Sequence, residues 1–512
     1  MSDLTLDDLR SGGQEFMEEV SREYYRAHAG LKSTAELQPI YERHARVLGD
    51  EALALARDAF IETTKDGPES SEERRSARVL LEWQVESQAA RVLASQDERE
   101  IAWESQAVLR LADGSSMPYQ RAVIALANSE EHAERIAIDV ARATLVAREL
   151  APLKRERLEQ ERSFIEGLGI APGYNATFQA VSGIDLDALA GECEGFLADT
   201  QAMWDEVHPR FLRDALGLDP GEATRADALA LFRGRQFDRF FPSALMQRSI
   251  LQQSRDMGMD PDAAGRVCFD VGEREGKRPR AFCAPVRVPD EVYLVMRPHG
   301  GQSDYITFLH ELGHALHFAF MRPDLPFEFR WLGDNSVTES YAMLYDHFMK
   351  NRGWLLRYTE LKRKDVDGFI RSAGYEELHF VRRYAAKLLY ERDLYAGRTA
   401  WDSLPDLYVD RLSGATTFQY QRADAFVDVD PRFYAARYVR AWQLQALLAE
   451  ALVDRFDEDW FRNPAAGPWI VEQLFAEGQR ELGSELAERV SGRVLSFRPL
   501  ISAIEQNLGG NA

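Results

Sequence analysis

Cysteine, uninterrupted apolar runs and net positive charge are all scarce in this sequence, and each shortage excludes a class of protein. The 512 residues include three cysteines, an odd and sparse set that argues against a disulfide framework and favours a reducing compartment. No window approaches the roughly 18 consecutive apolar residues of a membrane-spanning helix. The start, MSDLTLDDLRSGGQEF, is acidic and lacks the apolar core of a secretion signal. We therefore expect a cytoplasmic protein whose cysteines, Cys193, Cys268 and Cys283, are buried free thiols.

The charge balance restricts the partners. Lys and Arg number 62 against 84 Asp and Glu, which gives a formal net charge of -22. Such a charge repels phosphate backbones and anionic lipid, so we expect neither nucleic acid nor membrane surfaces as partners, and a cationic or neutral substrate fits better. Hydrophobic residues make up 45% of the chain, enough for a large core in two or three domain-sized units or one large helical body.

Helical periodicity dominates the chain. From Gln14 to Leu168, apolar residues recur at spacings of three and four between charged ones. Turn residues interrupt the pattern at 66–68, at 171–173 and at 219–221. The pattern predicts a mainly α protein.

One region alone has the pattern of a sheet. Residues 281–297 contain two β-rich runs separated by Pro289 and Asp290, which predicts a β-hairpin. We expect an N-terminal helical lobe at 1–170 and a helical catalytic region with this hairpin at 171–512, folded together as one body. The outer strand of the hairpin, residues 291–297, either packs in the sheet or pairs with an extended peptide.

The stretch FLHELGHALHF, residues 308–318, follows the hairpin and carries three of the ten histidines. Ser303 or Asp304 can cap a helix here and Pro323 stops it, so we predict a helix from 305 to about 321.

One metal ion cannot bind all three histidines, because His310 and His317 would lie about 10.5 Å apart along the helix axis. Glu311 favours the pair His310 and His314, since the motif is then HExxH. Two neutral imidazoles one turn apart bind zinc, and the glutamate takes the proton of the zinc-bound water as general base. The alternative is a chance match in a core helix. His317 is then expected behind the ligands or in the substrate pocket.

A catalytic zinc needs a third protein ligand and an open position. Glu339 follows His314 with 24 residues between them, enough for the first helix to end and a second to return antiparallel. Ser336 and Glu339 can instead form a capping box, and the residues alone leave both readings open. Asp346 can accept a hydrogen bond from a ligating imidazole. His347 is a rival ligand.

Several segments together resemble one family. They are FDVGEREGKRPRAFCAP, HELGHALH, TESYAML with Glu339, RFYAARYVRAW, and FAEGQRELGSELAERVSGRVLSFRPLISAIEQNLG. The sequence resembles the thimet oligopeptidase and oligoendopeptidase F family of zinc metallopeptidases over roughly residues 266 to 510. The resemblance implies a zincin-like, two-lobed helical body with a deep channel, one zinc per chain held by His310, His314 and Glu339, and cleavage of short unstructured peptides at internal bonds.

The sequence departs from the family in one place that concerns catalysis. Family members usually have a histidine in the loop before the tyrosine-bearing helix, whereas this chain has Arg432 there and no histidine after His379. The resemblance then assigns stabilisation of the developing oxyanion to Tyr434 or Tyr438, assisted by Arg432 or Arg437.

Two other functions remain open. A metallocarboxypeptidase of the carboxypeptidase Taq type shares HExGH and a helical body, and it would need a basic group for the free carboxylate of its substrate. A binding protein that retains zinc without turnover is the second alternative. Glu311 argues against it, because a structural site needs no base.

Overall fold

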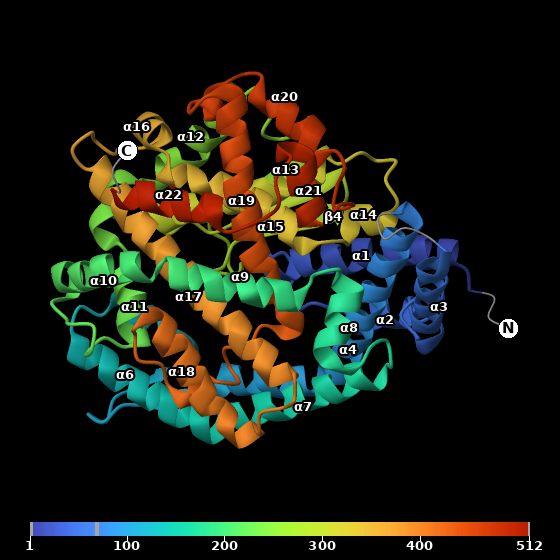
Figure 1. Ribbon diagram of the computed structural model, residues 1–512, viewed down its shortest axis with the longest axis horizontal. Coiled ribbons are helices and arrows are strands. Elements are labelled where there is room, and N and C mark those ends of the chain that lie inside the picture. Colours follow the sequence, from blue (N-terminus) through green and yellow to red (C-terminus); the bar gives the residue numbers. More distant parts are fainter. Residues whose placement is uncertain (1–3, 67–70, 510–512) are drawn as a thin grey trace. The chain divides into compact units, whose positions relative to one another are not determined.

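The computed structural model describes residues 4–66 and 71–509, drawn with their element labels in Figure 1. The chain forms two compact units, each assembled from segments far apart in the sequence. The first unit contains Met1–Gln88, Arg235–Ala373 and Arg440–Ala512, and the second contains Ala89–Gly234 and Gly374–Val439. The expected boundary at residue 170 lies inside the second unit. The expected division into 1–170 and 171–512 stays a prediction.

Helices make up most of both units, as the periodicity predicts, and three of them continue from one unit into the other: α4 (Glu72–Gln106), α17 (Val366–Tyr395) and α19 (Tyr434–Phe456). The other helices of the first unit are α1 (Leu6–His28), α2 (Gln38–Arg43), α3 (Asp50–Asp66), α12 (Ser243–Asp256), α13 (Gln302–Phe320), α14 (Phe327–Trp331), α15 (Asn335–Asp346), α16 (Arg352–Tyr358), α20 (Ala466–Ile470), α21 (Gly483–Ser491) and α22 (Arg498–Leu508). The second unit has α5 (Ala122–Asn128), α6 (His132–Leu145), α7 (Ala151–Gly167), α8 (Gly173–Ser182), α9 (Leu186–Asp199), α10 (Gln201–Leu216), α11 (Arg225–Phe232) and α18 (Leu404–Thr416).

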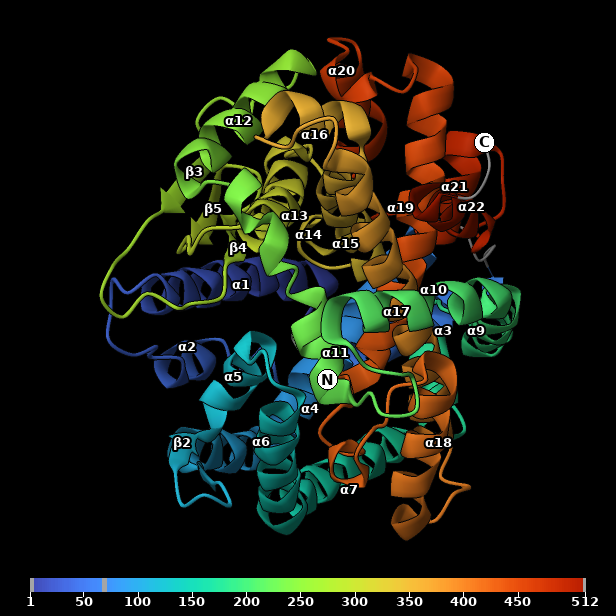
Figure 2. The ribbon, with the colours of Figure 1, turned by 90° about the vertical axis from the view of Figure 1, so that its left-hand side faces the viewer.

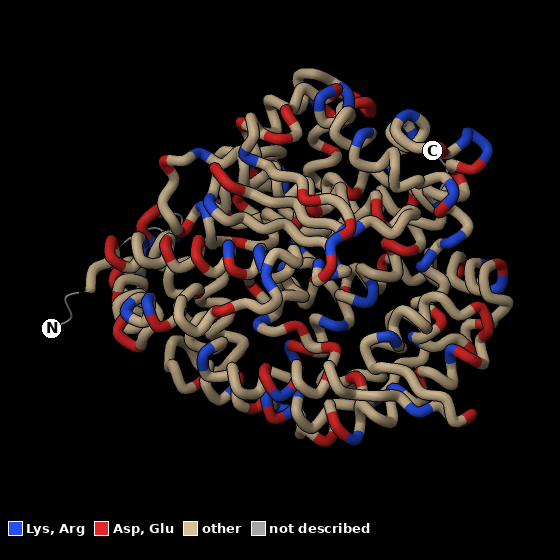
Figure 3. Tube along the Cα trace, turned by 180° about the vertical axis from the view of Figure 1, so that it is seen from behind, with Lys and Arg blue, Asp and Glu red and all other residues tan. Residues whose placement is uncertain are grey.

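The predicted turn at 171–173 leads from α7 into α8, which begins at Gly173, and the turn at 219–221 lies between α10 and α11. Residues 67 and 68 of the first predicted turn lie outside the described residues. Within the part of the chain that the structure describes, no helix is both long and apolar enough to span a membrane. Acidic and basic residues are interspersed along the chain rather than gathered in one segment (Figure 3).

The predicted hairpin forms, but the sheet is larger than predicted. β4 (Phe282–Arg287) and β5 (Glu291–Met296) pair antiparallel, and β3 (Val267–Val271) joins the other side of β5 in parallel, so the strand order is β3-β5-β4. The pairing of β5 with an extended peptide is therefore wrong, because neighbours already occupy both of its edges. A second small sheet of β1 (Val108–Arg110) and β2 (Ser116–Pro118) also forms, so the prediction that residues 281–297 alone have sheet structure is wrong.

The three-stranded sheet packs between α1 and α13. Tyr293 of β5 stacks on Tyr25 of α1 with ring centroids 3.8 Å apart, and α1 lies against β4 (Figure 2). On the other face, Leu294 belongs to the same buried cluster as Leu312 and Leu316 of α13. The alternation along β5 thus places α13 directly on the sheet.

Two local predictions differ from the structure. The residue before α13 is Gly301, and neither Ser303 nor Asp304 caps the helix. The Asp304 carboxylate instead accepts the backbone N–H groups of His299 and Gly300, at 2.8 and 2.6 Å, and so fixes the loop before the helix. The expectation of three buried thiols holds for Cys193, whereas Cys268 is exposed and Cys283 is intermediate.

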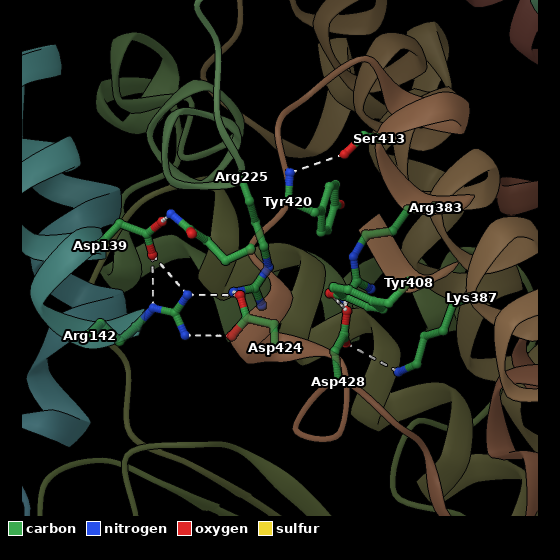
Figure 4. A network of polar contacts seen from close by, with 11 residues as sticks. Asp139, Arg142, Arg225, Arg383, Lys387, Tyr408, Ser413, Tyr420, Asp424 and Asp428 are labelled. Atoms are coloured by element: carbon green, nitrogen blue, oxygen red, sulfur yellow. Dashed lines mark hydrogen bonds and ion pairs between the residues drawn. The ribbon is translucent and has the colours of Figure 1, made fainter. Parts of the chain in front are cut away.

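The second unit holds its segment between α18 and α19 with buried charges (Figure 4). The Arg142 guanidinium of α6 makes two hydrogen bonds to the Asp424 carboxylate, at 2.6 and 2.8 Å. Arg383 of α17 donates to both oxygens of Asp428 at 2.6 Å, and Lys387 pairs with Asp430 at 2.8 Å. Opposite charges compensate one another here, because a buried charge without a partner is costly.

Candidate metal centre

The structure brings three of the predicted residues together between α13 and α15. The Nε2 atoms of His310 and His314 lie 3.6 and 3.8 Å from the Oε2 atom of Glu339. These donors form the only group of three or more His, Cys, Asp or Glu residues, among those the structure describes, whose ligand atoms all lie within 4.8 Å of one another. His347, the rival ligand, is not part of it.

Gly313 explains why the two helices approach so closely. A Cβ atom at this position would lie 2.7 Å from the Cα of Ala342 and 2.7 Å from the carbonyl oxygen of Tyr341, both on α15. These distances are shorter than real contacts allow, so the backbones meet only because residue 313 lacks a side chain. The approach places Glu339 opposite the two histidines.

Glu339 is not part of a capping box. The residue that caps α15 is Asp334, whose Oδ1 accepts the backbone N–H of Ser336 at 3.0 Å and its hydroxyl at 2.6 Å. The helix therefore begins one residue before Ser336, and Glu339 lies in its second turn. The capping alternative is wrong, and the Glu339 carboxylate faces the histidines instead.

His310 is the imidazole that meets Asp346, the carboxylate predicted to bond to one of the ligands. Its Nδ1 lies 3.0 Å from Oδ2 of Asp346, near the end of α15. Burial lowers the pKa of His310, but the hydrogen bond to Asp346 and the charges of Asp346 and Glu339 outweigh burial and raise the pKa to about 9. Asp346 thus orients the ring so that Nε2 faces His314 and Glu339.

His314 and His317 share one partner, the Thr338 hydroxyl of α15. Oγ1 of Thr338 lies 2.9 Å from Nδ1 of His314 and 3.2 Å from Nδ1 of His317. Nε2 of His317 lies 3.3 Å from the carbonyl oxygen of Gly478. His317 is fully buried, and burial lowers its pKa to about 3, so the ring is neutral. Of the two places expected for His317, the structure supports the one behind the ligands, because a buried ring does not line a substrate pocket.

Glu311 lies between the metal ligands and the sheet. Burial raises the pKa of its carboxyl, while the charge of His310 and a hydrogen bond from the backbone N–H of Cys283 act in the opposite direction. Cys283 belongs to β4, an edge strand of the sheet. A carboxylate with a raised pKa next to the ligand set is suited to accept a proton from water and to release it again.

The predicted oxyanion donors belong to the second unit. Tyr434 begins α19, and its ring lies 5.0 Å from that of Tyr438, which in turn lies 5.4 Å from the ring of Tyr384. Arg432 has left-handed backbone angles, φ 52 and ψ 42, and lies 3.6 Å from the buried Glu161. Arg437 is buried. The link between these residues and the metal centre stays a prediction.

The donor set fits a zinc ion. Two imidazole nitrogens and one carboxylate oxygen are the ligands of several catalytic zinc sites, with bonds of about 2.0 to 2.2 Å and a fourth position left open. Ligand atoms around a tetrahedral ion with such bonds lie about 3.3 Å apart, close to the 3.6 and 3.8 Å between Glu339 and the histidines. The Nδ1 atoms of both histidines have other partners, which leaves Nε2 for the metal.

Sequence reasoning missed Thr338 and Gly478. Thr338 stands immediately before Glu339, and residues one apart on a helix lie on neighbouring faces. This position is the one signal in the sequence that Thr338 lies near the histidines. Gly478 lies 161 residues from His317, and no pattern in the sequence indicates their contact. Cys283 was considered only as a buried thiol, whereas its backbone N–H is the group that contacts Glu311.

Comparison with solved structures shows the fold of peptidases. The chain matches a protein of Chlamydophila abortus assigned as a peptidase, with 14% identity over 98% of this chain and 89% of that chain and a TM-score of 0.69. It matches an M32 carboxypeptidase of Deinococcus radiodurans R1 with 17% identity over 98% and 99% of the two chains and a TM-score of 0.60. A third match, a structure called BsuCP, has 13% identity over 98% and 97% of the chains and a TM-score of 0.55.

These likenesses define the class: a mainly α, zincin-like peptidase fold with a small sheet beside the HExxH helix. No protein-family model matches the chain, and no curated protein matches it either. The resemblance to the thimet oligopeptidase and oligoendopeptidase F family therefore rests on the sequence segments alone.

Proposed function

We propose that this protein is a zinc metallopeptidase that hydrolyses short, unstructured peptides. The observation that carries the proposal is the meeting of His310, His314 and Glu339 at one point, with Glu311 beside them. A structural zinc site has no use for a buried base at this place, which argues against a binding protein without turnover. The peptidase fold of the solved relatives supports the same class of reaction.

The chemistry divides between the ion and the chain. When bound, zinc lowers the pKa of water to about 7 and polarises the scissile carbonyl. His310, His314 and Glu339 hold the ion, and Asp346 and Thr338 hold the two imidazoles in orientation. Glu311 accepts the proton of the attacking water and delivers it to the leaving amine. The resemblance assigns the hydrogen bond to the developing oxyanion to Tyr434 or Tyr438.

Two specificities compete, cleavage of internal bonds and removal of C-terminal residues. The sequence segments favour an oligopeptidase. One observation favours a carboxypeptidase: Arg280, an exposed residue two positions before β4, is near enough for its charge to lower the pKa of the Glu311 carboxyl. A guanidinium near the base could bind the free carboxylate of a peptide's C-terminus. The M32 carboxypeptidase among the solved relatives fits this candidate as well.

One experiment tests the class and separates the two candidates. A peptide of about 10 residues is incubated as free acid and as C-terminal amide, with and without a chelator, and the products are weighed by mass spectrometry. Internal cuts in both forms support the oligopeptidase. Stepwise loss of C-terminal residues that stops on amidation, and that weakens in Arg280→Ala but not in the nearby Arg278→Ala, supports the carboxypeptidase. Cleavage that continues in chelator, in protein shown to contain no metal, would refute both.

A further inference from the structure

A chain of three hydrogen bonds runs from the metal centre to the backbone of a distant segment. The first bond joins Nδ1 of His314 to the Thr338 hydroxyl, and the second joins that hydroxyl to Nδ1 of His317. The third joins Nε2 of His317 to the carbonyl oxygen of Gly478. The chemical nature of each group fixes the direction in which the protons point along the chain.

The hydrogen-bond chain ends at Gly478, where the donor and the acceptor are known. Its carbonyl oxygen only accepts hydrogen bonds, so Nε2 of His317 carries a proton. His317 is fully buried among the rings of Phe318, Tyr341 and Phe475. An apolar environment disfavours the imidazolium form, so Nδ1 of the neutral ring has no proton and accepts.

The proton position on His317 then determines the proton position on His314. Thr338 has one hydroxyl proton, and its hydrogen bonds go to the two histidines. Since Nδ1 of His317 accepts, Thr338 donates its proton there, and its oxygen accepts from Nδ1–H of His314. A neutral imidazole with the proton on Nδ1 has its lone pair on Nε2, the atom that faces Glu339 at 3.8 Å.

We infer that Thr338 and His317 are positioning residues that hold His314 in its metal-binding tautomer. The hydrogen bonds connect His314 through Thr338 and His317 to a backbone carbonyl, whereas His310 is held by the Asp346 carboxylate. Without the Thr338 hydroxyl, His314 would be free to place its proton on Nε2, which would have to leave before a metal binds. The inference rests on the proposed metal site.

The test compares three variants. Thr338→Val keeps the shape of the side chain but removes the hydroxyl, Thr338→Ser keeps the hydroxyl, and Ser340→Ala removes another buried hydroxyl of α15, one that bonds to the Val337 carbonyl. Zinc affinity is measured on metal-depleted protein by competition with a chromophoric chelator, and urea unfolding of the same metal-free protein reports stability. We expect Thr338→Val to bind zinc about 10- to 100-fold more weakly, with Thr338→Ser and Ser340→Ala close to wild type.

A second measurement does not depend on how the variants fold. Nitrogen-15 NMR of the histidine rings in metal-free wild type, at neutral pH, should show the proton on Nδ1 of His314 and on Nε2 of His317. A proton on Nε2 of His314 would overturn the inference, as would zinc affinity of Thr338→Val within threefold of wild type. If wild type itself does not bind zinc, the proposed function fails, and the tautomers still decide the direction of the hydrogen-bond chain.

Discussion

On the proposed function, turnover depends on Glu311, because its neighbours prepare it to exchange a proton. Burial raises the pKa of its carboxyl, and the N–H of Cys283 and the charge of His310 limit that rise. A carboxylate that is moderately basic accepts a proton from water and still gives it up to an amine. Glu311 is not among the three residues whose ligand atoms converge, so metal binding and catalysis should separate at this residue.

Glu311→Gln should therefore retain zinc and lose nearly all activity. The amide has the shape of the carboxylate but cannot accept the proton, and we expect kcat to fall by a factor of about 10² to 10⁴. Elemental analysis checks the metal and steady-state cleavage of a short peptide checks the rate. Activity within tenfold of wild type would exclude Glu311 as the base.

At the scale of elements, the centre depends on how closely α13 and α15 pack. Gly313 lets the two backbones meet, and the buried faces of both helices join one cluster that includes Leu309, Leu312 and Leu344. Rigid helices hold ligand atoms more accurately than loops do. The separation of these two helices thus sets the distance from Glu339 to the histidines.

Gly313→Ala should separate the helices and weaken metal binding together with stability. The new methyl group meets backbone atoms at 2.7 Å, and overpacking of this kind typically costs about 1 to 3 kcal/mol. Gly368→Ala is the matched control, since an added Cβ there meets nothing within 4 Å; replacing a helical glycine at such a site stabilises by about 0.4 to 1 kcal/mol. Urea unfolding and zinc titration of both variants check the difference. Unchanged zinc affinity in Gly313→Ala would contradict the argument.

The sequence predicted those elements whose signals are local. The HExxH helix and the hairpin follow from spacing within about one turn or one short loop. Glu339 and Asp346 lie 25 and 36 residues from His314 and His310, and the pattern of a second helix that returns antiparallel to the first predicts their place. The parallel pairing of β3 with β5 was not predicted, because Val267 and Val292 meet only through the tertiary fold. The sequence does not single out Asp334 as the capping residue of α15, because Ser336 and Glu339 also match the pattern of a capping box.

At the scale of the whole molecule, buried neutral histidines make stability depend on pH. His208 of the second unit is 1% exposed and stacks on Trp204. Its Nδ1 atom lies 2.6 Å from the hydroxyl oxygen of Tyr375. Burial, with the charge of Arg382 as a smaller cause, lowers the pKa of His208 to about 4. The unfolded chain binds a proton here more readily than the folded one, so the stabilisation is complete above the unfolded pKa of about 6.5 and is lost as pH falls towards 4.

His208→Gln should make the protein less sensitive to acid. Between pH 7 and pH 5 the protonation of His208 in the unfolded state removes about 2 kcal/mol of stability from wild type, and this loss should be absent from the variant. Urea unfolding at both pH values measures it, with the exposed His299 replaced by Gln as control. Equal losses in wild type and His208→Gln would show that this histidine does not titrate as its burial implies.

The back of the candidate metal centre is made by residues 474–483, which follow the HExxH helix by more than a hundred residues, and this order matters during synthesis. Gly478 accepts from His317, the carbonyl of Leu474 accepts from the hydroxyl of Tyr341, and the N–H of Gly483 donates to Asp334. A ribosome that has just released the HExxH helix still has more than a hundred residues to add before these contacts exist. The nascent chain therefore presents its histidines with one side uncovered until residues 474–483 have been made and packed. On the proposed function, loading with a wrong metal is then a hazard of the growing polypeptide rather than of the folded protein.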